Sequence, residues 1–293
     1  MYRSLLFVPG DSEKKIAKAM TVGADVVILD LEDAVADSRK AAARGIVREA
    51  LRAGVARSDC SLFVRINPLG SPLCHEDLAA VMAGRPDGIV LPKAASADDT
   101  VRLSNRLDVL EAENGIGAGA TRIIPVATEV PEALFTLGSY RDAGPRLAAL
   151  TWGAEDLAAA VGALDNKDPD GRWSAPFELA RSLCLFAASA AGVPAIDTLY
   201  ADFRDSTGLA ASSRRARRDG FAGKLAIHPD QVSVINSAFT PTAEEVARAR
   251  RIVELFEANP GAGALSLDGR MLDMPHLVQA RKTVALAERL TAS

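Results

Sequence analysis

Cysteine and histidine are scarce in this chain of 293 residues, which contains three of each. Cys60, Cys74 and Cys184 have neither the spacing of a disulfide framework nor that of zinc ligands, so neither kind of site is expected. Cys184 lies in the apolar stretch 183–188, where a cysteine behaves as a small core residue.

Long apolar runs are also missing from the sequence. No apolar stretch approaches the roughly 20 residues that a membrane helix needs, and the N-terminus does not have the pattern of a signal peptide. We therefore expect a cytoplasmic protein with reduced thiols and no membrane partner.

Aromatic residues make up only 5% of the chain, so alanine, leucine and valine must fill most of a core that the apolar share of 48% makes sizeable. The net charge is −4 with acids and bases interspersed, which argues against a nucleic-acid partner. The one basic cluster, residues 214–218, falls in a predicted helix and is expected to be a solvated face.

Short apolar runs are abundant, and polar residues with useful chemistry follow them. The runs are residues 26–29 before Asp30, 62–64 before Arg65, 88–91 before Lys93, 123–127 before Glu129, 147–151 before Asp156 and 225–227 before His228. Such runs are typical of buried strands in a parallel sheet. If these strands close into a barrel, the residues at their carboxyl ends meet at one mouth, as in an enzyme.

The strands alternate with helical patterns in about eight units, the number expected of a TIM (β/α)8 barrel. We expect strands at residues 5–8, 26–30, 62–66, 88–91, 122–127, 147–152, 195–198 and 224–227. We expect helices at residues 12–20, 38–51, 76–82, 97–113, 131–137, 176–191, 209–219 and 230–237. A doubly wound open sheet is the alternative, but its Gly-rich phosphate turn is missing after the first strand. The predicted catalytic domain is therefore a barrel over residues 1–239.

Residues 240–293 form a predicted C-terminal helical extension beyond the barrel. Thr242 is the expected cap of a helix that ends near Ala258, and residues 264–272 look like a hairpin with an Asp-Gly turn. A last helix is expected over residues 275–290. We expect this extension to pack on a neighbouring subunit.

Glu129 and Asp156 follow adjacent predicted strands. Two carboxylates without a neighbouring cysteine or histidine suit a hard cation such as Mg²⁺, most of whose coordination sphere would stay open for water and substrate. The alternative is a pair of solvated loop acids.

Arg65, Lys93 and His228 also lie at predicted strand ends. Arg65 could hold a substrate carboxylate, or it could form a structural salt bridge to Asp30, Glu32 or Asp33. For Lys93 a Schiff-base role is conceivable, but an ion-paired structural lysine is favoured. For His228 a helix-entry role or a backbone contact is favoured.

Several of these segments together resemble one enzyme family. They are RSLLFVPG at 3–10, LDLEDAV at 29–35, RIN at 65–67, LPK at 91–93, WGAEDL at 152–157, AIHP at 226–229 and GRMLD at 269–273. In this order they resemble the citrate lyase β-subunit-like family of the HpcH/HpaI aldolase superfamily, which includes malyl-CoA and citramalyl-CoA lyases. The resemblance covers the whole chain.

The resemblance implies a Mg²⁺-dependent TIM-barrel lyase that cleaves or forms a carbon–carbon bond next to a thioester. Its substrate would be a 3-hydroxyacyl-CoA such as malyl-, citramalyl- or citryl-CoA, giving acetyl-CoA and a 2-oxo acid. Glu129 and Asp156 would be the metal ligands, and Arg65 would face the 2-oxo acid. Asp273 would reach into the site of an adjacent subunit of a homotrimer or hexamer, where it could give or take the proton of the acyl group.

The resemblance also assigns the carrier site. Phe7, Lys18 and the backbone of Ile227 and His228 lie where the family holds coenzyme A. Some relatives carry a basic residue at the position of Ser12, near the coenzyme A phosphates, so an acyl-carrier protein stays open as the carrier. Two alternatives to the lyase follow: a malyl-CoA thioesterase or malate synthase-type activity, and a citrate lyase β subunit that depends on a carrier protein.

Overall fold

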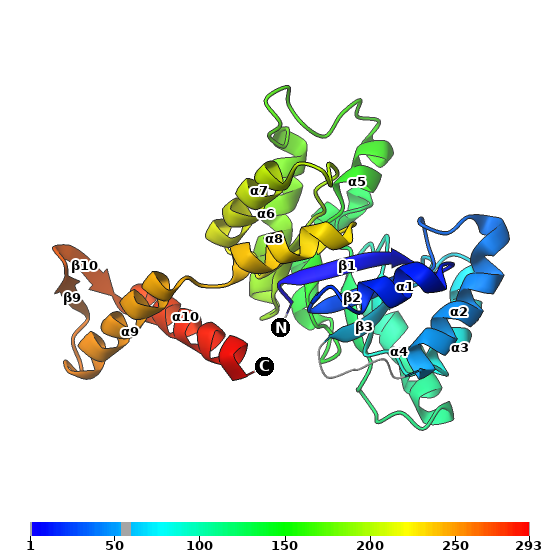
Figure 1. Ribbon diagram of the computed structural model, residues 1–293, viewed down its shortest axis with the longest axis horizontal. Coiled ribbons are helices and arrows are strands. Elements are labelled where there is room, and N and C mark those ends of the chain that lie inside the picture. Colours follow the sequence, from blue (N-terminus) through cyan, green and yellow to red (C-terminus); the bar gives the residue numbers. More distant parts are fainter. Residues whose placement is uncertain (1, 54–59, 293) are drawn as a thin grey trace. The chain divides into compact units, whose positions relative to one another are not determined.

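The computed structural model describes residues 2–53 and 60–292 (Figure 1). The chain divides into two compact units, residues 1–237 and 238–293. None of the helices in these described ranges is long and apolar enough to span a membrane.

The first unit contains a sheet of eight parallel strands in the order β5-β4-β3-β2-β1-β8-β7-β6. The strands are β1 Ser4–Pro9, β2 Val26–Asp30, β3 Ser61–Arg65, β4 Gly88–Leu91, β5 Arg122–Pro125, β6 Leu150–Thr151, β7 Ala195–Asp197 and β8 Gly223–Ala226. Parallel bridges from Ile123 to Leu147 and from Val126 to Thr151 join β5 to the β6 segment. The sheet therefore closes, and the predicted TIM barrel is confirmed.

Helices connect the strands along the chain. The α-helices that follow the strands are α1 Glu13–Ala19, α2 Lys40–Arg52, α3 Leu73–Met82, α4 Ala97–Glu113, α5 Ala154–Val161, α6 Ala175–Ala190, α7 Ser206–Asp219 and α8 Pro229–Phe239, whose last two residues belong to the second unit. Short 3-10 helices lie at η1 Asp37–Arg39, η2 Pro131–Phe135 and η3 Leu137–Asp142.

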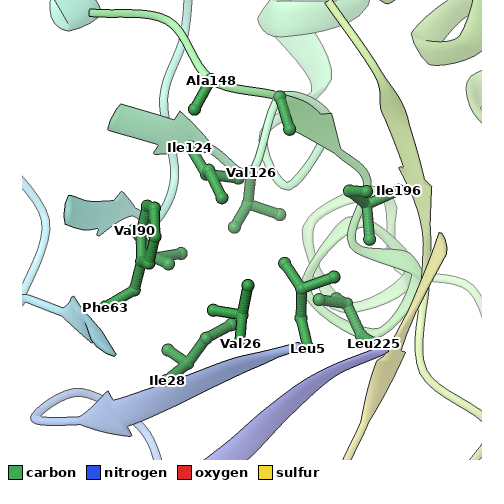
Figure 2. Packing of buried hydrophobic residues seen from close by; sticks show 11 residues of the cluster. Leu5, Val26, Ile28, Phe63, Val90, Ile124, Val126, Ala148, Ile196 and Leu225 are labelled. Carbon is green, nitrogen blue, oxygen red and sulfur yellow. The ribbon is translucent and has the colours of Figure 1, made fainter. Parts of the chain in front are cut away.

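The barrel interior is filled by apolar side chains from every strand or from the residues next to it (Figure 2). These side chains are Leu5, Val26, Ile28, Phe63, Val90, Ile124, Val126, Ala148, Ala149, Ile196 and Leu225. Gly88 makes room for Phe63, because a Cβ at Gly88 would lie 2.1 Å from the Phe63 ring. The interior is thus a packed core, and chemistry is confined to the strand ends.

Two segments differ from the sequence-based expectation. The predicted helix at 131–137 is a pair of 3-10 helices that meet at Thr136, whose hydroxyl donates to the carbonyls of Ala133 and Ala95 and so competes with a regular helix. No helix was predicted for residues 154–161, where the structure has α5, which begins after Gly153 and ends at Gly162 with φ of 71°.

The second unit consists of α9 Ala243–Glu257, the hairpin β9 Ala264–Leu267 and β10 Arg270–Asp273, and α10 Met274–Ala292. Thr242 and Glu245 form a capping box at the start of α9, which confirms the predicted cap. Asp268 and Gly269 both have positive φ, as a tight Asp-Gly hairpin turn requires. A small core containing Phe256, Leu272 and Leu277 holds these elements together.

Candidate active site

Strand register brings Asp30 and Arg65 side by side at the carboxyl ends of β2 and β3. Asp30 is the register partner of both Pro9 on β1 and Arg65 on β3. Two positions earlier on the same strands, Leu5, Ile28 and Phe63 belong to the barrel core, and Phe7 packs against that core. Because side chains alternate along a strand, Phe7, Asp30 and Arg65 also face inward, one layer closer to the mouth.

Arg65 is held by acids that come from the end of β2. Its Nε lies 2.7 Å from Asp30 Oδ1 and its Nη2 2.6 Å from Asp30 Oδ2, while Nη1 lies 3.0 Å from Glu32 Oε2. Burial by itself lowers the pKa of Arg65, but the hydrogen bonds and the charge of Asp30 outweigh it and raise that pKa. The salt bridge considered from the sequence is therefore present. It uses Nε and Nη2 for Asp30, while Nη1 contacts Glu32.

Asp30 and Glu32 are both buried, at 0% and 4% exposure. Asp30 also accepts hydrogen bonds from the N–H groups of Glu32 and Ala34, at 2.9 and 3.0 Å. Burial raises the pKa of Glu32, and the charges of Arg65 and Lys93 oppose that rise. Glu32 Oε2 is buried without a hydrogen bond, so its contact with Arg65 is electrostatic.

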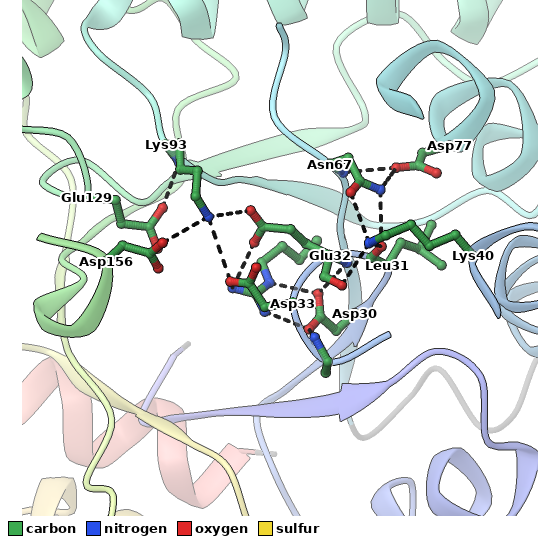
Figure 3. Close-up of polar contacts among 12 residues, drawn as sticks. Asp30, Leu31, Glu32, Asp33, Lys40, Asn67, Asp77, Lys93, Glu129 and Asp156 are labelled. Atoms are coloured by element: carbon green, nitrogen blue, oxygen red, sulfur yellow. Dashed lines mark hydrogen bonds and ion pairs between the residues drawn. The ribbon is translucent and has the colours of Figure 1, made fainter. Parts of the chain in front are cut away.

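Lys93 lies two residues beyond β4 with a left-handed backbone, φ 51°. Its Nζ lies 2.6 Å from Glu32 Oε1 and 3.1 Å from Asp156 Oδ1 (Figure 3). Burial by itself lowers the pKa of Lys93. The hydrogen bond to Glu32 and the surrounding carboxylates outweigh burial, so the pKa of Lys93 is raised above its ordinary value. The lysine is therefore ion-paired, which is the arrangement favoured from the sequence.

Glu129 follows β5 and is 5% exposed. Its Oε2 accepts a hydrogen bond of 2.6 Å from the backbone N–H of Lys93. Burial raises the pKa of Glu129 to about 8, against that hydrogen bond, and the charge of Asp156 adds to the rise. Gly153 provides the space for this side chain, since a Cβ there would lie 2.6 Å from Glu129 Cγ.

Asp156 lies in the first turn of α5, so this unpredicted helix is what aims it at the site. Its side chain is 32% exposed and contacts Lys93. Figure 3 shows the carboxylates of Glu129 and Asp156 turned toward the same space beside the Lys93 ammonium. The prediction that the two acids come together is therefore met by the geometry of the strand and helix ends.

The donor set of Glu129 and Asp156 fits a hard divalent cation. Both residues supply only oxygen, and Glu129 Oε1 and Asp156 Oδ2 take part in none of the hydrogen bonds of the described residues. Burial raises the pKa of Glu129, and a cation bound beside it would favour its charged form. In the described ranges no group of three or more His, Cys, Asp or Glu side chains could hold a metal, so a cation here would have two protein ligands.

The residues assigned to the coenzyme A site lie on three elements. Phe7 lies on β1 with its ring 4.8 Å from the Arg65 guanidinium, and Lys18 is exposed in the last turn of α1. Ile227 and His228 follow β8, and their N–H groups donate to Gln231 Oε1 at 2.8 and 3.2 Å. This contact fixes the entry to α8, which is the backbone role favoured for His228.

Phe203 is a residue that sequence reasoning missed. Its ring stacks on the His228 ring, with centroids 4.9 Å apart and planes inclined by 22°. Phe203 is 45% exposed, so the pair presents a flat aromatic surface to solvent. An aromatic residue within the polar loop 201–205 was the available signal.

Asp273 belongs to the second unit, at the end of β10 and directly before α10. Its Oδ1 lies 2.5 Å from His276 Nδ1, and its side chain is 40% exposed. Within its own chain Asp273 therefore lies at a helix end, with His276 as its partner. Its role in a neighbouring site stays a prediction.

Comparison with known proteins identifies relatives over the whole chain. The HpcH/HpaI aldolase/citrate lyase family matches residues 3–229, and the C-C Bond Lyase of the TIM-Barrel fold family matches residues 187–290. Mitochondrial citramalyl-CoA lyase of Rattus norvegicus is 35% identical over 97% of this chain and 86% of its own length. Citrate lyase subunit beta of Escherichia coli K12 is 34% identical over 98% and 93%.

Two further relatives extend the comparison. A (3S)-malyl-CoA thioesterase of Cereibacter sphaeroides is 32% identical over 99% of this chain and 96% of its own length. The solved structure of CitE from Mycobacterium tuberculosis with magnesium, acetoacetate and coenzyme A has a TM-score of 0.81, 33% identity and 98% coverage of both chains. The resemblance drawn from the motifs is thus confirmed, and the chain belongs to the HpcH/HpaI aldolase/citrate lyase family.

Proposed function

We propose that this protein is a Mg²⁺-dependent lyase that cleaves, or forms, a 3-hydroxyacyl-CoA such as malyl-, citramalyl- or citryl-CoA. The products of cleavage would be acetyl-CoA and a 2-oxo acid. The observation that carries the proposal is the pairing of Glu129 and Asp156 beside Arg65 and Lys93 at one barrel mouth. Relatives named for citramalyl-CoA and citrate lyases, and a relative solved with magnesium and coenzyme A, support it.

Retro-aldol cleavage of such a thioester has three chemical needs: an electrophile at the hydroxyl that becomes a ketone, a site that tolerates the thioester enolate, and an acid that protonates it. Mg²⁺ held by Glu129 and Asp156 would supply the electrophile. Arg65 would face the 2-oxo acid through Nη1, whose contacts with Glu32 and Asp33 are longer than those that join Nε and Nη2 to Asp30. The Asp30 contact holds the guanidinium plane in one orientation, which favours recognition of a planar carboxylate.

Coenzyme A would bind beside Phe7 on β1, Lys18 on α1, and Ile227 and His228 after β8. Lys18 is exposed and cationic, which suits a phosphate, while Ile227 is 38% exposed and apolar. Since Gln231 already engages the N–H groups at 227 and 228, the carrier would meet a rigid loop there.

Asp273 would complete the active site of an adjacent subunit in a homotrimer or hexamer, as the acid that protonates the enolate. Near it on the second unit, Met271, Met274 and Val278 are 69%, 49% and 49% exposed. Apolar side chains exposed together favour a protein partner, and a symmetric oligomer of this chain is the proposed one. We also propose a cytoplasmic location.

A second candidate function is hydrolysis of the thioester after condensation, favoured by the relative named (3S)-malyl-CoA thioesterase. A third is that of a β subunit whose acyl group arrives on a carrier protein, favoured by the relative named citrate lyase subunit beta. Both would use the same mouth residues.

One panel of assays separates the three functions. Purified protein is given malyl-, citramalyl- and citryl-CoA with Mg²⁺ or with EDTA, and both the 2-oxo acid and free coenzyme A thiol are measured. A lyase forms 2-oxo acid only with Mg²⁺ and releases no thiol, whereas a thioesterase releases thiol during turnover. Absence of turnover with every thioester would contradict both and support the carrier-dependent subunit.

A further inference from the structure

Lys93 engages both candidate metal ligands, through two different groups. Its backbone N–H donates to Glu129 Oε2 at 2.6 Å, and its Nζ lies 3.1 Å from Asp156 Oδ1. The same ammonium lies 2.6 Å from Glu32 Oε1 and 3.7 Å from Asp33 Oδ2 (Figure 3). One residue therefore orders a group of four acids that come from two separate strand ends and a helix.

The Lys93 ammonium is the cation beside the candidate metal ligand Asp156. In the ranges that the structure describes, it alone forms an ion pair with Asp156. Arg65, the other cation at the mouth, is bound to Asp30 by two hydrogen bonds and reaches Glu32 and Asp33 with its remaining nitrogen. The ammonium thus holds a place at Asp156 that a divalent cation would also need.

The backbone of Lys93 has a separate task. A φ of 51° is a left-handed conformation that costs a residue with a Cβ about 1 kcal/mol or more. This conformation is what turns the N–H toward Glu129, whose side chain is confined on another side by Gly153. Glycine or asparagine would adopt this conformation at a lower cost. The lysine therefore indicates that the ammonium, which contacts Glu32 and Asp156, has a role at this position.

We propose that Lys93 is a positioning residue of the metal site. Its left-handed backbone holds Glu129, and its ammonium occupies the cation position at Asp156 until a divalent cation replaces it there. The ammonium then stays with Glu32, its shortest contact. This inference rests on the proposed function only in that Glu129 and Asp156 bind Mg²⁺.

Two substitutions separate the tasks of the backbone and the ammonium. Asparagine tolerates a left-handed backbone, so Lys93→Asn keeps the hydrogen bond to Glu129 and removes the competing charge. Loss of a like charge a few Å from the cation should tighten Mg²⁺ binding about tenfold or more. Valine is β-branched and disfavours positive φ, so Lys93→Val should release Glu129 and bind Mg²⁺ more weakly than Lys93→Asn.

The test measures Mg²⁺ affinity by titration calorimetry, and the melting temperature with and without Mg²⁺, on the full-length chain. Lys14→Asn is the matched control, since Lys14 is exposed on α1 and its loss changes net charge equally. We expect Lys93→Asn to melt below the wild-type protein in EDTA and to gain more from Mg²⁺ than wild type does. Lys93→Gly, which also suits the left-handed backbone, repeats the measurement if the asparagine variant folds poorly.

The outcomes distinguish the inference from the function on which it rests. Wild-type protein that binds Mg²⁺, with a Lys93→Asn variant that binds it equally or more weakly, would overturn the role of the ammonium and leave the proposed function standing. Equal tightening by Lys14→Asn would overturn it as well, because net charge alone would explain the gain. If neither the wild-type protein nor any variant binds Mg²⁺, the metal-dependent function falls together with the inference.

Discussion

Asp30 and Arg65 face each other across β2 and β3, and two hydrogen bonds of 2.7 and 2.6 Å join their side chains in a bidentate pair. Asp30 is fully buried, so this pair fixes the plane of the guanidinium at the barrel mouth. The third nitrogen, Nη1, is thereby held in one orientation beside Glu32 and Asp33 at the mouth.

We expect Arg65→Lys to lose most activity and to lower the free energy of unfolding by about 1–3 kcal/mol, because an ammonium cannot satisfy both oxygens of buried Asp30. Urea denaturation measures the stability, and calorimetry measures the binding of pyruvate or oxaloacetate. Lower stability with unchanged affinity for the 2-oxo acid would show that Arg65 acts only as a salt bridge.

Asp156→Ala should abolish Mg²⁺-dependent turnover and leave the fold intact, because Asp156 is partly exposed on the first turn of α5 and is not part of the core. Calorimetry should detect no Mg²⁺ binding to the variant, and circular dichroism should match the wild-type spectrum. Near-normal activity of this variant in EDTA would show that the metal assignment is wrong.

Gly153→Ala should impair the site through Glu129. Its φ of −115° is compatible with alanine, but the new Cβ would lie 2.6 Å from Glu129 Cγ and 3.0 Å from its Oε1. We expect weaker Mg²⁺ binding and a loss of about 1–3 kcal/mol in stability, the usual cost of overpacking. Gly45→Ala is the control, since a Cβ there meets nothing within 4 Å on helix α2 and should be neutral or stabilise by up to ~1 kcal/mol. Full activity of Gly153→Ala would mean that Glu129 can move without consequence.

Glu111 makes the free energy of unfolding depend on pH in the acidic range. Burial by itself would raise its pKa, but two hydrogen bonds from Arg146, each 2.6 Å, and the N–H groups of Thr121 and Gly119 hold that pKa at about 2. The ordinary pKa is 4.5, so the stabilisation is present above that pH and is lost as pH falls from about 4.5 toward about 2.

Glu111→Gln removes this titration. A pKa difference of that size corresponds to ~3 kcal/mol, so the variant should be less stable at pH 7 by up to that amount. Its urea midpoint should fall less steeply than that of the wild-type protein between about pH 5 and pH 3. Parallel pH profiles of the two proteins would show that the Arg146 pair does not contribute.

The proposed shared site predicts complementation between variants. Asp273→Asn should impair turnover and spare Mg²⁺ binding, while Glu129→Ala should lose both. Mixed oligomers of the two variants should recover some activity, because some sites would combine an intact acid from one chain with an intact metal site from another. A monomer in sedimentation experiments, or no recovery after proven subunit exchange, would rule out the shared site.

The sequence by itself determined the barrel and the position of Glu129, Asp156 and Arg65 at its mouth. Apolar runs of strand length mark the buried strands, and the carboxyl ends of parallel strands meet at one edge whatever their exact register. The hairpin and the cap at Thr242 were predictable for a similar reason, because local turn and capping chemistry depends on residues close in sequence.

The tertiary structure alone decided which acid forms the bidentate pair with Arg65, because the sequence offered Asp30, Glu32 and Asp33 equally. The register of β2 on β3 gives this place to Asp30, while Glu32 and Asp33 contact only Nη1. The tertiary structure also decided that Lys93 has a left-handed backbone bonded to Glu129, and that Phe203 stacks on His228. These contacts join residues from different strand ends and loops, so their geometry depends on packing in three dimensions, which no periodicity along the chain records.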